Sequence, residues 1–387
     1  MKQLISLIIA VFCFGQMAWA QPICPLTNKP IVPKEVSSLE SFKGIPILHN
    51  GRIKPLDTYA RSVLLQLSGK SSYEKMPAIH WLARVVFAPV VTQDDKIFLI
   101  NNPDIAHALR IEEEKYRRYS FNQLKPSLSR LKDLAAAADK IDEKKRDVVE
   151  NELMRVYQNV LTYSDLSVSF SFAIPDSDFS ISDEGTLKTL GINPENKDFS
   201  FLDIAIRASQ LQKLMAPLEN VDSSKWTDAQ KKIANVVNNL YSWANTYTHL
   251  PLTIIPSYHS HEESWNSPWD AITVDLSLPQ SRQEISSLRD MFFAYWDGQQ
   301  LDFDLAIKAF RQSIEQRVGN HYETSFRNLP LELIFNRLQL FFIAKILYFL
   351  TFFLFLCSLI NPKKIIYPFG LIFLISGFLC HAPFVRF

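Results

Sequence analysis

The chain has 387 residues, with 41 basic and 40 acidic side chains and a formal net charge of +1. A charge so close to zero creates no overall field that would attract nucleic acid or an acidic polymer, so neither is expected as a partner. Only ten glycines occur, and none lies in a phosphate-binding loop pattern, which argues against a nucleotide-binding fold.

Residues 1–20 have the pattern of a secretory signal peptide. Lys2 precedes an apolar stretch from Leu4 to Phe14, and Ala18-Trp19-Ala20 is a small-x-small cleavage pattern. We expect cleavage after Ala20, and an uncleaved segment would leave the same topology. Residues 21–43 are Pro-rich and polar, and are predicted to form a linker.

Residues 44–337 are predicted to form one α-rich domain with minor β structure. Asn50-Gly51 is a tight-turn signal, and Asp57 or Thr58 is placed to cap a helix that ends at Gly69. Apolar residues at three- and four-residue steps predict further helices, around residues 81–86, 126–163, 201–218, 227–247, 283–296 and 302–316. Short extended segments are expected at 96–101 and 252–256, and the turn-rich segment 176–197 favours a subdomain boundary.

The C-terminal fifty residues are strongly apolar. Residues 338–360 and 365–382 are each predicted to be a transmembrane helix, because a bilayer core needs about 20 apolar residues in helical form. The turn 361–364 carries Lys363 and Lys364, which places it in the cytoplasm by the positive-inside rule. The fold class is therefore mostly α with minor β, a large exported helical domain followed by a two-helix transmembrane hairpin. The bulk of the chain and the tail 383–387 are expected in the periplasm, at a bacterial inner membrane.

Few side chains are arranged for chemistry. His259 and His261, followed by Glu262 and Glu263, are the only clustered metal-capable residues, yet they lack the i, i+4 spacing of a helical metal site, and a solvated loop is favoured over a metal site. His381 ends the second apolar segment, where an imidazole either ligates haem or hydrogen-bonds at the lipid headgroups. No pattern for nucleophilic catalysis is present, so no catalytic residue is predicted.

One segment resembles a known family. Residues 49–61, His-Asn-Gly-Arg-Ile-Lys-Pro-Leu-Asp-Thr-Tyr-Ala-Arg, are similar to the (D/N)-G-R-x-K-P-x-x-T-x-A-R segment in the periplasmic region of system II cytochrome c biogenesis proteins, whose halves are called ResB/CcsB and ResC/CcsA. Residues 331–337 are similar to the E-x-x-Y-N passage by which that region returns to the membrane, with Phe335 where tyrosine is usual. Gly377, His381 and Arg386 are similar to the helix end that precedes the haem-handling domain in longer relatives.

The resemblance implies a membrane-anchored periplasmic subunit that helps attach haem to apocytochrome c. The chain lacks the tryptophan-rich WWD segment and the multi-span CcsA-type half, so the resemblance implies that a separate multi-span partner holds haem and performs catalysis. Haem would reach this chain only through that partner, with His381 as the candidate ligand. Arg52, Lys54, Asp57 and Thr58 are the candidate partner-binding residues, although turn and cap chemistry explains part of the motif equally well.

Two hypotheses from other classes stay open. The chain is alternatively a membrane-tethered periplasmic domain that binds a ligand or peptide in an unrelated pathway, and this hypothesis predicts a deep apolar pocket. A metal-dependent hydrolase built on His259 and His261 is the other alternative, and it requires a third ligand that converges on them in space.

Overall fold

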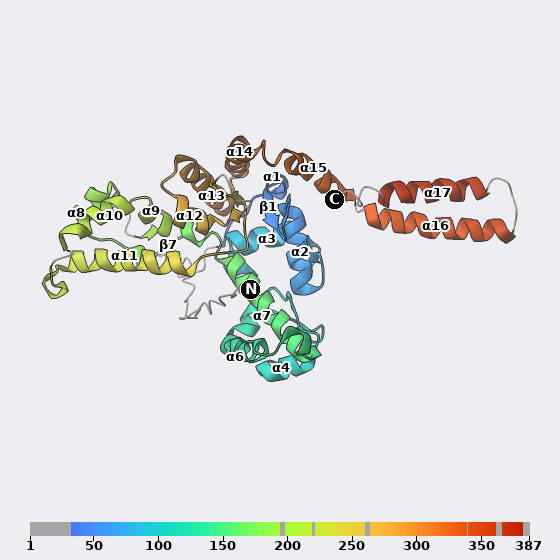
Figure 1. The fold of residues 1–387 in the computed structure, drawn as a ribbon, viewed down its shortest axis with the longest axis horizontal. Coiled ribbons are helices and arrows are strands. Elements are labelled where there is room, and N and C mark those ends of the chain that lie inside the picture. Colours follow the sequence, from blue (N-terminus) through green and yellow to red (C-terminus); the bar gives the residue numbers. More distant parts are fainter. Residues whose placement is uncertain are drawn as a thin grey trace, which may run out of the picture. The chain divides into compact units, whose positions relative to one another are not determined.

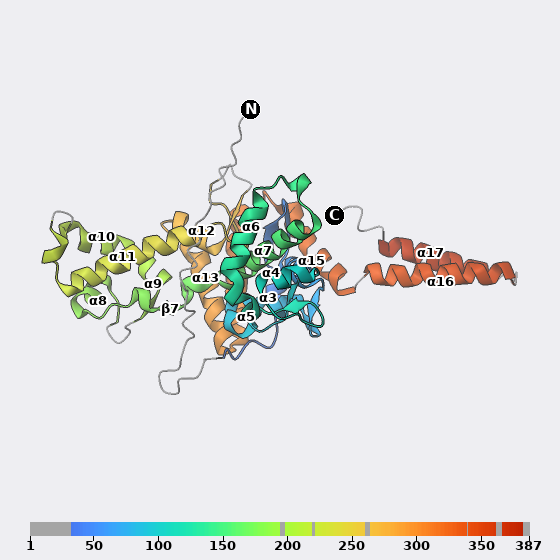
Figure 2. The ribbon, with the colours of Figure 1, turned by 90° about the horizontal axis from the view of Figure 1, so that it is seen from below.

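The computed structural model describes residues 32–193, 198–218, 221–259, 264–338, 340–360 and 366–381. The predicted signal peptide 1–20, residues 21–31 of the predicted linker, the turn 361–364 and the tail 383–387 lie outside these residues. The chain divides into two compact units, one up to Tyr322 and one from Glu323 onward. Each unit is described by itself, and its helices can be followed in Figures 1 and 2.

The first unit is mostly helical, as the sequence predicts. Its α-helices are α1 (Glu40–Lys43), α2 (Leu56–Ser68), α3 (Ala78–Phe87), α4 (Pro103–Leu109), α5 (Phe121–Leu124), α6 (Leu128–Asp139), α7 (Val148–Ser167), α8 (Glu184–Leu190), α9 (Phe201–Ala205), α10 (Ala208–Met215), α11 (Asp228–Thr246), α12 (Pro268–Asp275), α13 (Pro279–Asp297) and α14 (Gln300–Val318). Short 3-10 helices connect them at Pro89–Thr92, Lys125–Ser127, Glu143–Lys145, Ser171–Ala173, Ser177–Phe179, Ala216–Leu218 and Ser223–Lys225.

The minor β structure consists of two-stranded antiparallel ladders. They pair β1 (Pro46–His49) with β2 (Arg52–Pro55), β3 (Ser72–Tyr73) with β4 (Met76–Pro77), β5 (Phe98–Leu99) with β6 (Arg118–Tyr119), β7 (Pro175–Asp176) with β8 (Phe199–Ser200), and β9 (Ile255–Pro256) with β10 (Trp265–Asn266). The β1–β2 hairpin turns at Asn50-Gly51, both with positive φ, the conformation of a type I′ turn.

Helix α3 is the centre of the core. All but two of its ten residues are buried, Trp81 and Phe87 completely, and it packs against α2, α7 and α13. The ring of Phe87 lies 4.8 Å from the rings of both Phe170 and Tyr295. This aromatic contact joins segments that lie far apart in the sequence, so the core is built from long-range packing.

Residues 32–43 differ from the predicted linker. Val36, Leu39 and Phe42 are buried, and α1 packs on α14. The apolar residues of this segment are few, but their three-residue spacing places them on one side, where they cover the core. The described part of the predicted linker is therefore an integral part of the first unit.

The start of α2 also differs from the prediction. The helix begins at Leu56 with Pro55 as its N-cap and no side-chain cap, so neither Asp57 nor Thr58 caps it. Pro55 has φ of −68° and ψ of 149°, the extended conformation that an N-cap residue usually adopts and that the proline ring allows. The predicted end is confirmed, because Gly69 adopts the left-handed conformation with φ of 71°.

The second unit contains α15 (Glu323–Leu338), α16 (Leu340–Ile360) and α17 (Ile366–His381). Helices α16 and α17 lie side by side (Figures 1 and 2). Glycines make this approach close: a Cβ atom at Gly370 would come within 2.6 Å of the Phe355 ring, and one at Gly377 within 2.9 Å of the Tyr348 ring. Among the described helices, only α16 is long and apolar enough to cross a membrane, and the apolar part of α17 is shorter.

Candidate functional site

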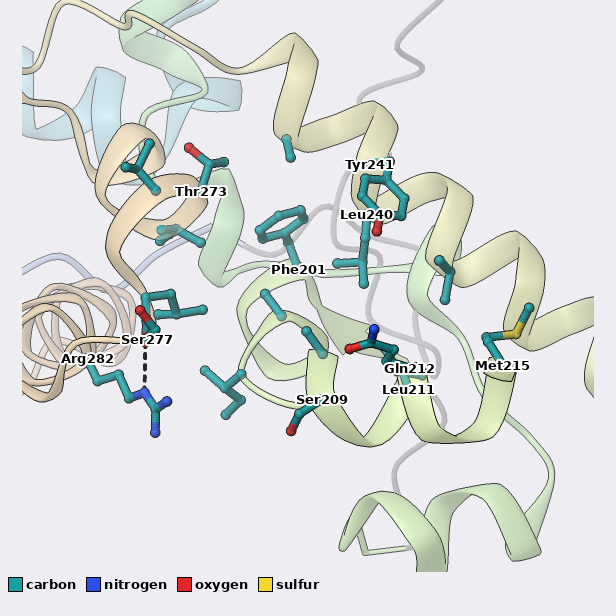
Figure 3. Close-up of a pocket in the computed structure, with 18 residues that line it drawn as sticks. Phe201, Ser209, Leu211, Gln212, Met215, Leu240, Tyr241, Thr273, Ser277 and Arg282 are labelled. Atoms are coloured by element: carbon teal, nitrogen blue, oxygen red, sulfur yellow. Dashed lines mark hydrogen bonds between the residues drawn. The ribbon is translucent and has the colours of Figure 1, made fainter. Parts of the chain in front are cut away.

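An open apolar cleft lies within the first unit, between α9, α10, α11 and α12. Its volume is about 750 Å3, which falls within the usual range of ligand pockets. Figure 3 shows the side chains that line it, namely Phe201, Ala205, Ile206, Ala208, Ser209, Leu211, Gln212, Met215, Val237, Leu240, Tyr241, Ala244, Ile272, Thr273, Val274, Leu276, Ser277 and Arg282.

The helices that form the cleft contribute residues at helical spacing. Helix α10 provides Leu211 and Met215 four residues apart, and α11 provides Val237, Leu240 and Ala244 at three- and four-residue steps. Residues with this spacing lie on one face of a helix. Two neighbouring helices therefore turn apolar faces toward the same cleft.

Capping residues fix where these helices begin. Ser200, Thr227 and Ser267 each start a helix with a reciprocal capping box, at α9, α11 and α12 respectively. A capping box satisfies two backbone N–H donors at the start of the helix, and a cap typically stabilises a helix by about 1 kcal/mol. The walls of the cleft are therefore positioned by local sequence signals as well as by packing.

The floor of the cleft is part of the core. Phe201 and Leu211 are almost fully buried, and the Phe201 ring lies 4.7 Å from Trp269. The indole N–H of Trp269 donates to the Val168 carbonyl at 3.0 Å. A ring held on a hydrogen-bonded, fully buried tryptophan forms a rigid floor.

The rim of the cleft leaves apolar side chains in solvent. Ile206, Tyr241 and Val274 are 40%, 69% and 66% exposed. Three large apolar side chains exposed around one concave surface are typical of a binding site, whereas single exposed apolar residues are common everywhere.

Arg282, the first-turn arginine of α13, stands at one end of the cleft (Figure 3). Its Nε donates to the Leu276 carbonyl at 2.8 Å, which orients the guanidinium. It is the only charged side chain among the described residues that line the cleft.

The predicted partner-binding residues lie together on the hairpin and the start of α2. Arg52 faces His49 in the hairpin register, and Lys54 is buried with its Nζ 3.1 Å from the Nδ1 of His49. Burial and the nearby lysine both lower the pKa of His49. The His49 ring meets the edge of Tyr59 at 5.0 Å between centroids.

The other two predicted residues have local structural contacts. Asp57 is buried and accepts a hydrogen bond from the Nε of Arg61 at 2.8 Å, an i, i+4 ion pair. The carbonyl of Thr58 accepts from Ser62 Oγ at 2.9 Å. The Asp57 carboxylate therefore supports the helix, and Arg52 and Lys54 are the basic residues next to the turn.

The metal candidates are described only in part. His261 lies outside the described residues, and the Nε2 of His259 is 3.6 Å from the Oδ1 of Asp275. Burial raises the pKa of the Asp275 carboxyl. Within the described part of the chain, no group of three metal-capable side chains occurs, so the third ligand that a hydrolase requires is not among these residues.

A buried charge network beside His259 was not predicted. Glu284 is fully buried and receives hydrogen bonds from Arg317 Nε and Nη2, Ser313 and Tyr258. The Arg317 guanidinium also lies 4.1 Å from the Tyr258 ring centroid. The four donors around Glu284 compensate its burial, so this network is structural.

His381 is the last residue of α17, and its side chain is not described. The sequence prediction that it ends the second apolar helix is confirmed for the backbone. Its role as a haem ligand stays a prediction.

Comparison with known proteins does not decide between these sites. No family model matches the chain, and no curated protein sequence is significantly similar to it. The function must therefore be argued from the residues and their geometry.

Proposed function

We propose that this chain is a membrane-anchored periplasmic subunit of a cytochrome c maturation system. It serves as a scaffold for apocytochrome c and as a docking partner for a multi-span CcsA-type haem lyase. The proposal rests on the resemblance of residues 49–61. The observation that supports it most is that this segment folds as one hairpin-and-helix unit, with basic Arg52 and Lys54 adjoining a sharp turn. Arg52, which is half-buried, suits an acidic group on a partner, whereas the buried Lys54 would support it by holding His49.

The proposed anchor is the pair α16 and α17. Helix α16 has 21 residues, enough to cross a hydrocarbon core of about 30 Å. Helix α17 has 16 residues, or about 24 Å at 1.5 Å per residue, so it would cross with local thinning of the bilayer. Lys363 and Lys364 would face the cytoplasm. The close glycine contacts of α17 resemble the small-residue packing of membrane helices.

In this proposal the chemistry belongs to the partner. Thioether formation needs haem and a reduced apocytochrome held together in a fixed orientation, and a scaffold contributes by positioning. The chain acts as a non-catalytic subunit, and His381 at the periplasmic end of α17 is its candidate haem ligand.

Reconstitution tests this function. The full chain would be co-expressed with the CcsA-type protein of the same genome and a reporter apocytochrome, in a bacterial host without its own cytochrome c maturation genes. Haem-stained gels should show covalent haem on the reporter only when both proteins are present. Equal haem attachment without this chain would exclude the proposed role.

The apolar cleft favours a second candidate function, a periplasmic domain that binds a ligand or peptide. A cavity of about 750 Å3 with exposed apolar residues at its rim meets the expectation of that hypothesis. It would be tested by native mass spectrometry of the full chain released from lipid nanodiscs. A bound molecule should appear with the wild-type chain and disappear with Leu240→Asp, whereas Val148→Asp, at an exposed position at the start of α7, should retain it. A chain that carries no bound molecule would count against this function.

A further inference from the structure

The cleft has an uneven distribution of polar groups. Its apolar side chains come from α9, α10, α11 and α12, and six lining side chains carry hydrogen-bonding groups, namely Ser209, Gln212, Tyr241, Thr273, Ser277 and Arg282. Figure 3 shows Arg282 at one end and Met215 at the other, with Phe201 and Leu240 between them. The cleft is therefore lined by twelve apolar and six polar side chains, with one positive charge at its end.

Arg282 is arranged to bind an anion. Its Nε already donates to the Leu276 carbonyl, and within the described residues no hydrogen bond or ion pair is found for its Nη1 and Nη2 atoms. A guanidinium fixed through Nε presents the two Nη donors as a fork, a geometry that matches the two oxygens of a carboxylate. No carboxylate lines the cleft in the described residues to compete for it.

We propose that the cleft binds an amphiphile with a long alkyl chain and a carboxylate head, of the fatty acid class. The head pairs with the Arg282 guanidinium, and the alkyl chain lies along Leu240 and Leu211 toward Met215. The flexible thioether of Met215 suits a chain end of variable length. This inference rests on the second candidate function, the ligand-binding domain, and is independent of a role in cytochrome c maturation.

The single positive charge of the cleft and its apolar surface together favour a fatty acid as the ligand. An alkyl chain has no polar groups, so burying it against an apolar wall leaves no unsatisfied donor or acceptor. An extended peptide would bring backbone donors and acceptors, which the lining could match only with a few hydroxyl and amide groups. The single cation at the end then fits a single anionic head.

Photo-crosslinking tests the proposal. The probe is palmitate with a diazirine in its chain, added to the full chain in phosphatidylcholine nanodiscs and mapped by peptide mass spectrometry. We expect adducts on cleft residues such as Met215 and Leu240. Adducts on α16 and α17 report the fraction of probe in the bilayer and serve as an internal reference.

Matched variants isolate the contribution of Arg282. Arg282→Gln should lower cleft labelling about tenfold relative to α16 labelling, because a charge-assisted pair is lost, and Arg282→Lys should restore part of it. Lys308→Gln, which removes an exposed cation of α14, should leave cleft labelling unchanged. An excess of palmitate should compete, and its methyl ester should compete poorly.

Three outcomes of the crosslinking experiment would overturn the proposal. They are labelling confined to α16 and α17, cleft labelling that does not depend on Arg282, and equal competition by palmitate and its methyl ester. A bound molecule without a carboxylate, or a helical peptide, detected in the native mass spectra would also overturn it while leaving the ligand-binding function in place. A chain with no bound molecule and no cleft labelling would exclude both the fatty-acid proposal and the ligand-binding function.

Discussion

The ring of Phe201 lies 4.7 Å from the indole of Trp269, and the same ring lines the apolar cleft. One residue therefore links the folding core to the candidate binding surface. Any ligand in the cleft would contact a side chain whose position is set by the core, which keeps the site preformed.

Replacement of Phe201 should therefore damage stability. Phe201→Ala removes a buried ring and its contact with Trp269, so we expect a loss of about 3–5 kcal/mol in the free energy of unfolding. Tyr241→Ala, at the exposed rim of the same cleft, should change it by less than about 1 kcal/mol. Urea unfolding of the full chain in nanodiscs, followed by tryptophan fluorescence, measures both. Similar losses for the two variants would contradict the division into floor and rim.

The Glu284 network should show the cost of an uncompensated buried charge. Arg317→Leu leaves Glu284 without its bidentate partner, and we expect a loss of about 3–5 kcal/mol in the free energy of unfolding. The double variant Arg317→Leu with Glu284→Leu should recover most of that loss. As a control, Lys96→Ala breaks an exposed ion pair with Glu114 and should cost less than about 1 kcal/mol. A double variant as unstable as Arg317→Leu would show that the unpaired Glu284 carboxylate is not the main cause of the loss in the free energy of unfolding.

Asp165 should make stability depend on pH. Burial raises the pKa of its carboxyl to about 6, above the value of about 3.9 in an unfolded chain. The folded state therefore binds more protons between pH 4 and 6, and the contribution of Asp165 to stability falls as pH rises through that window.

Asp165→Asn should remove this effect. We expect the variant to be more stable than the wild type at pH 7, by about 1–3 kcal/mol, and to converge with it near pH 4. Asp133→Asn, at an exposed position of α6, should follow the wild-type curve. Urea unfolding at a series of pH values provides the comparison, and a wild-type advantage at pH 7 would mean that the Asp165 carboxylate has a stabilising partner.

The helices were largely predictable because their signals are local. The apolar spacing around Trp81 and Leu82 predicts α3, and Gly69 ends α2 as expected. The continuous helix predicted across 126–163 is instead broken between α6 and α7, where Asp147 starts α7 with a capping box. The apolar spacing of two helices can run in phase across a loop, so the pattern alone does not reveal the break.

The cleft could not be predicted in the same way. Val237, Leu240 and Ala244 look like an ordinary core-facing stripe of α11, and only their tertiary placement shows that they line an open cavity. The network around Glu284 likewise joins residues from α13, α14 and the loop after β9. A single Glu within an amphipathic helix gives no sign that it is buried.

The proposed membrane hairpin predicts a definite topology. Alkaline phosphatase, which is active only outside the cytoplasm, would be fused after residues 338, 364 and 387. We expect activity after 338, little after 364 and activity again after 387, because two spans return the chain to its starting side. Activity after 364 as high as after 338 would mean that α16 does not cross the bilayer. Little activity after 387 would mean that α17 does not cross back.

The most direct test of the account is deletion of this gene in its host, followed by measurement of covalently bound c-type haem on gels and of b-type haem by pyridine haemochrome spectra. The proposal predicts loss of c-type haem with b-type haem intact, restored by a wild-type copy. A complementing copy with His381→Ala would then show whether that histidine takes part. Normal c-type cytochromes in the deletion strain would contradict the proposed function and leave the ligand-binding domain as the better description.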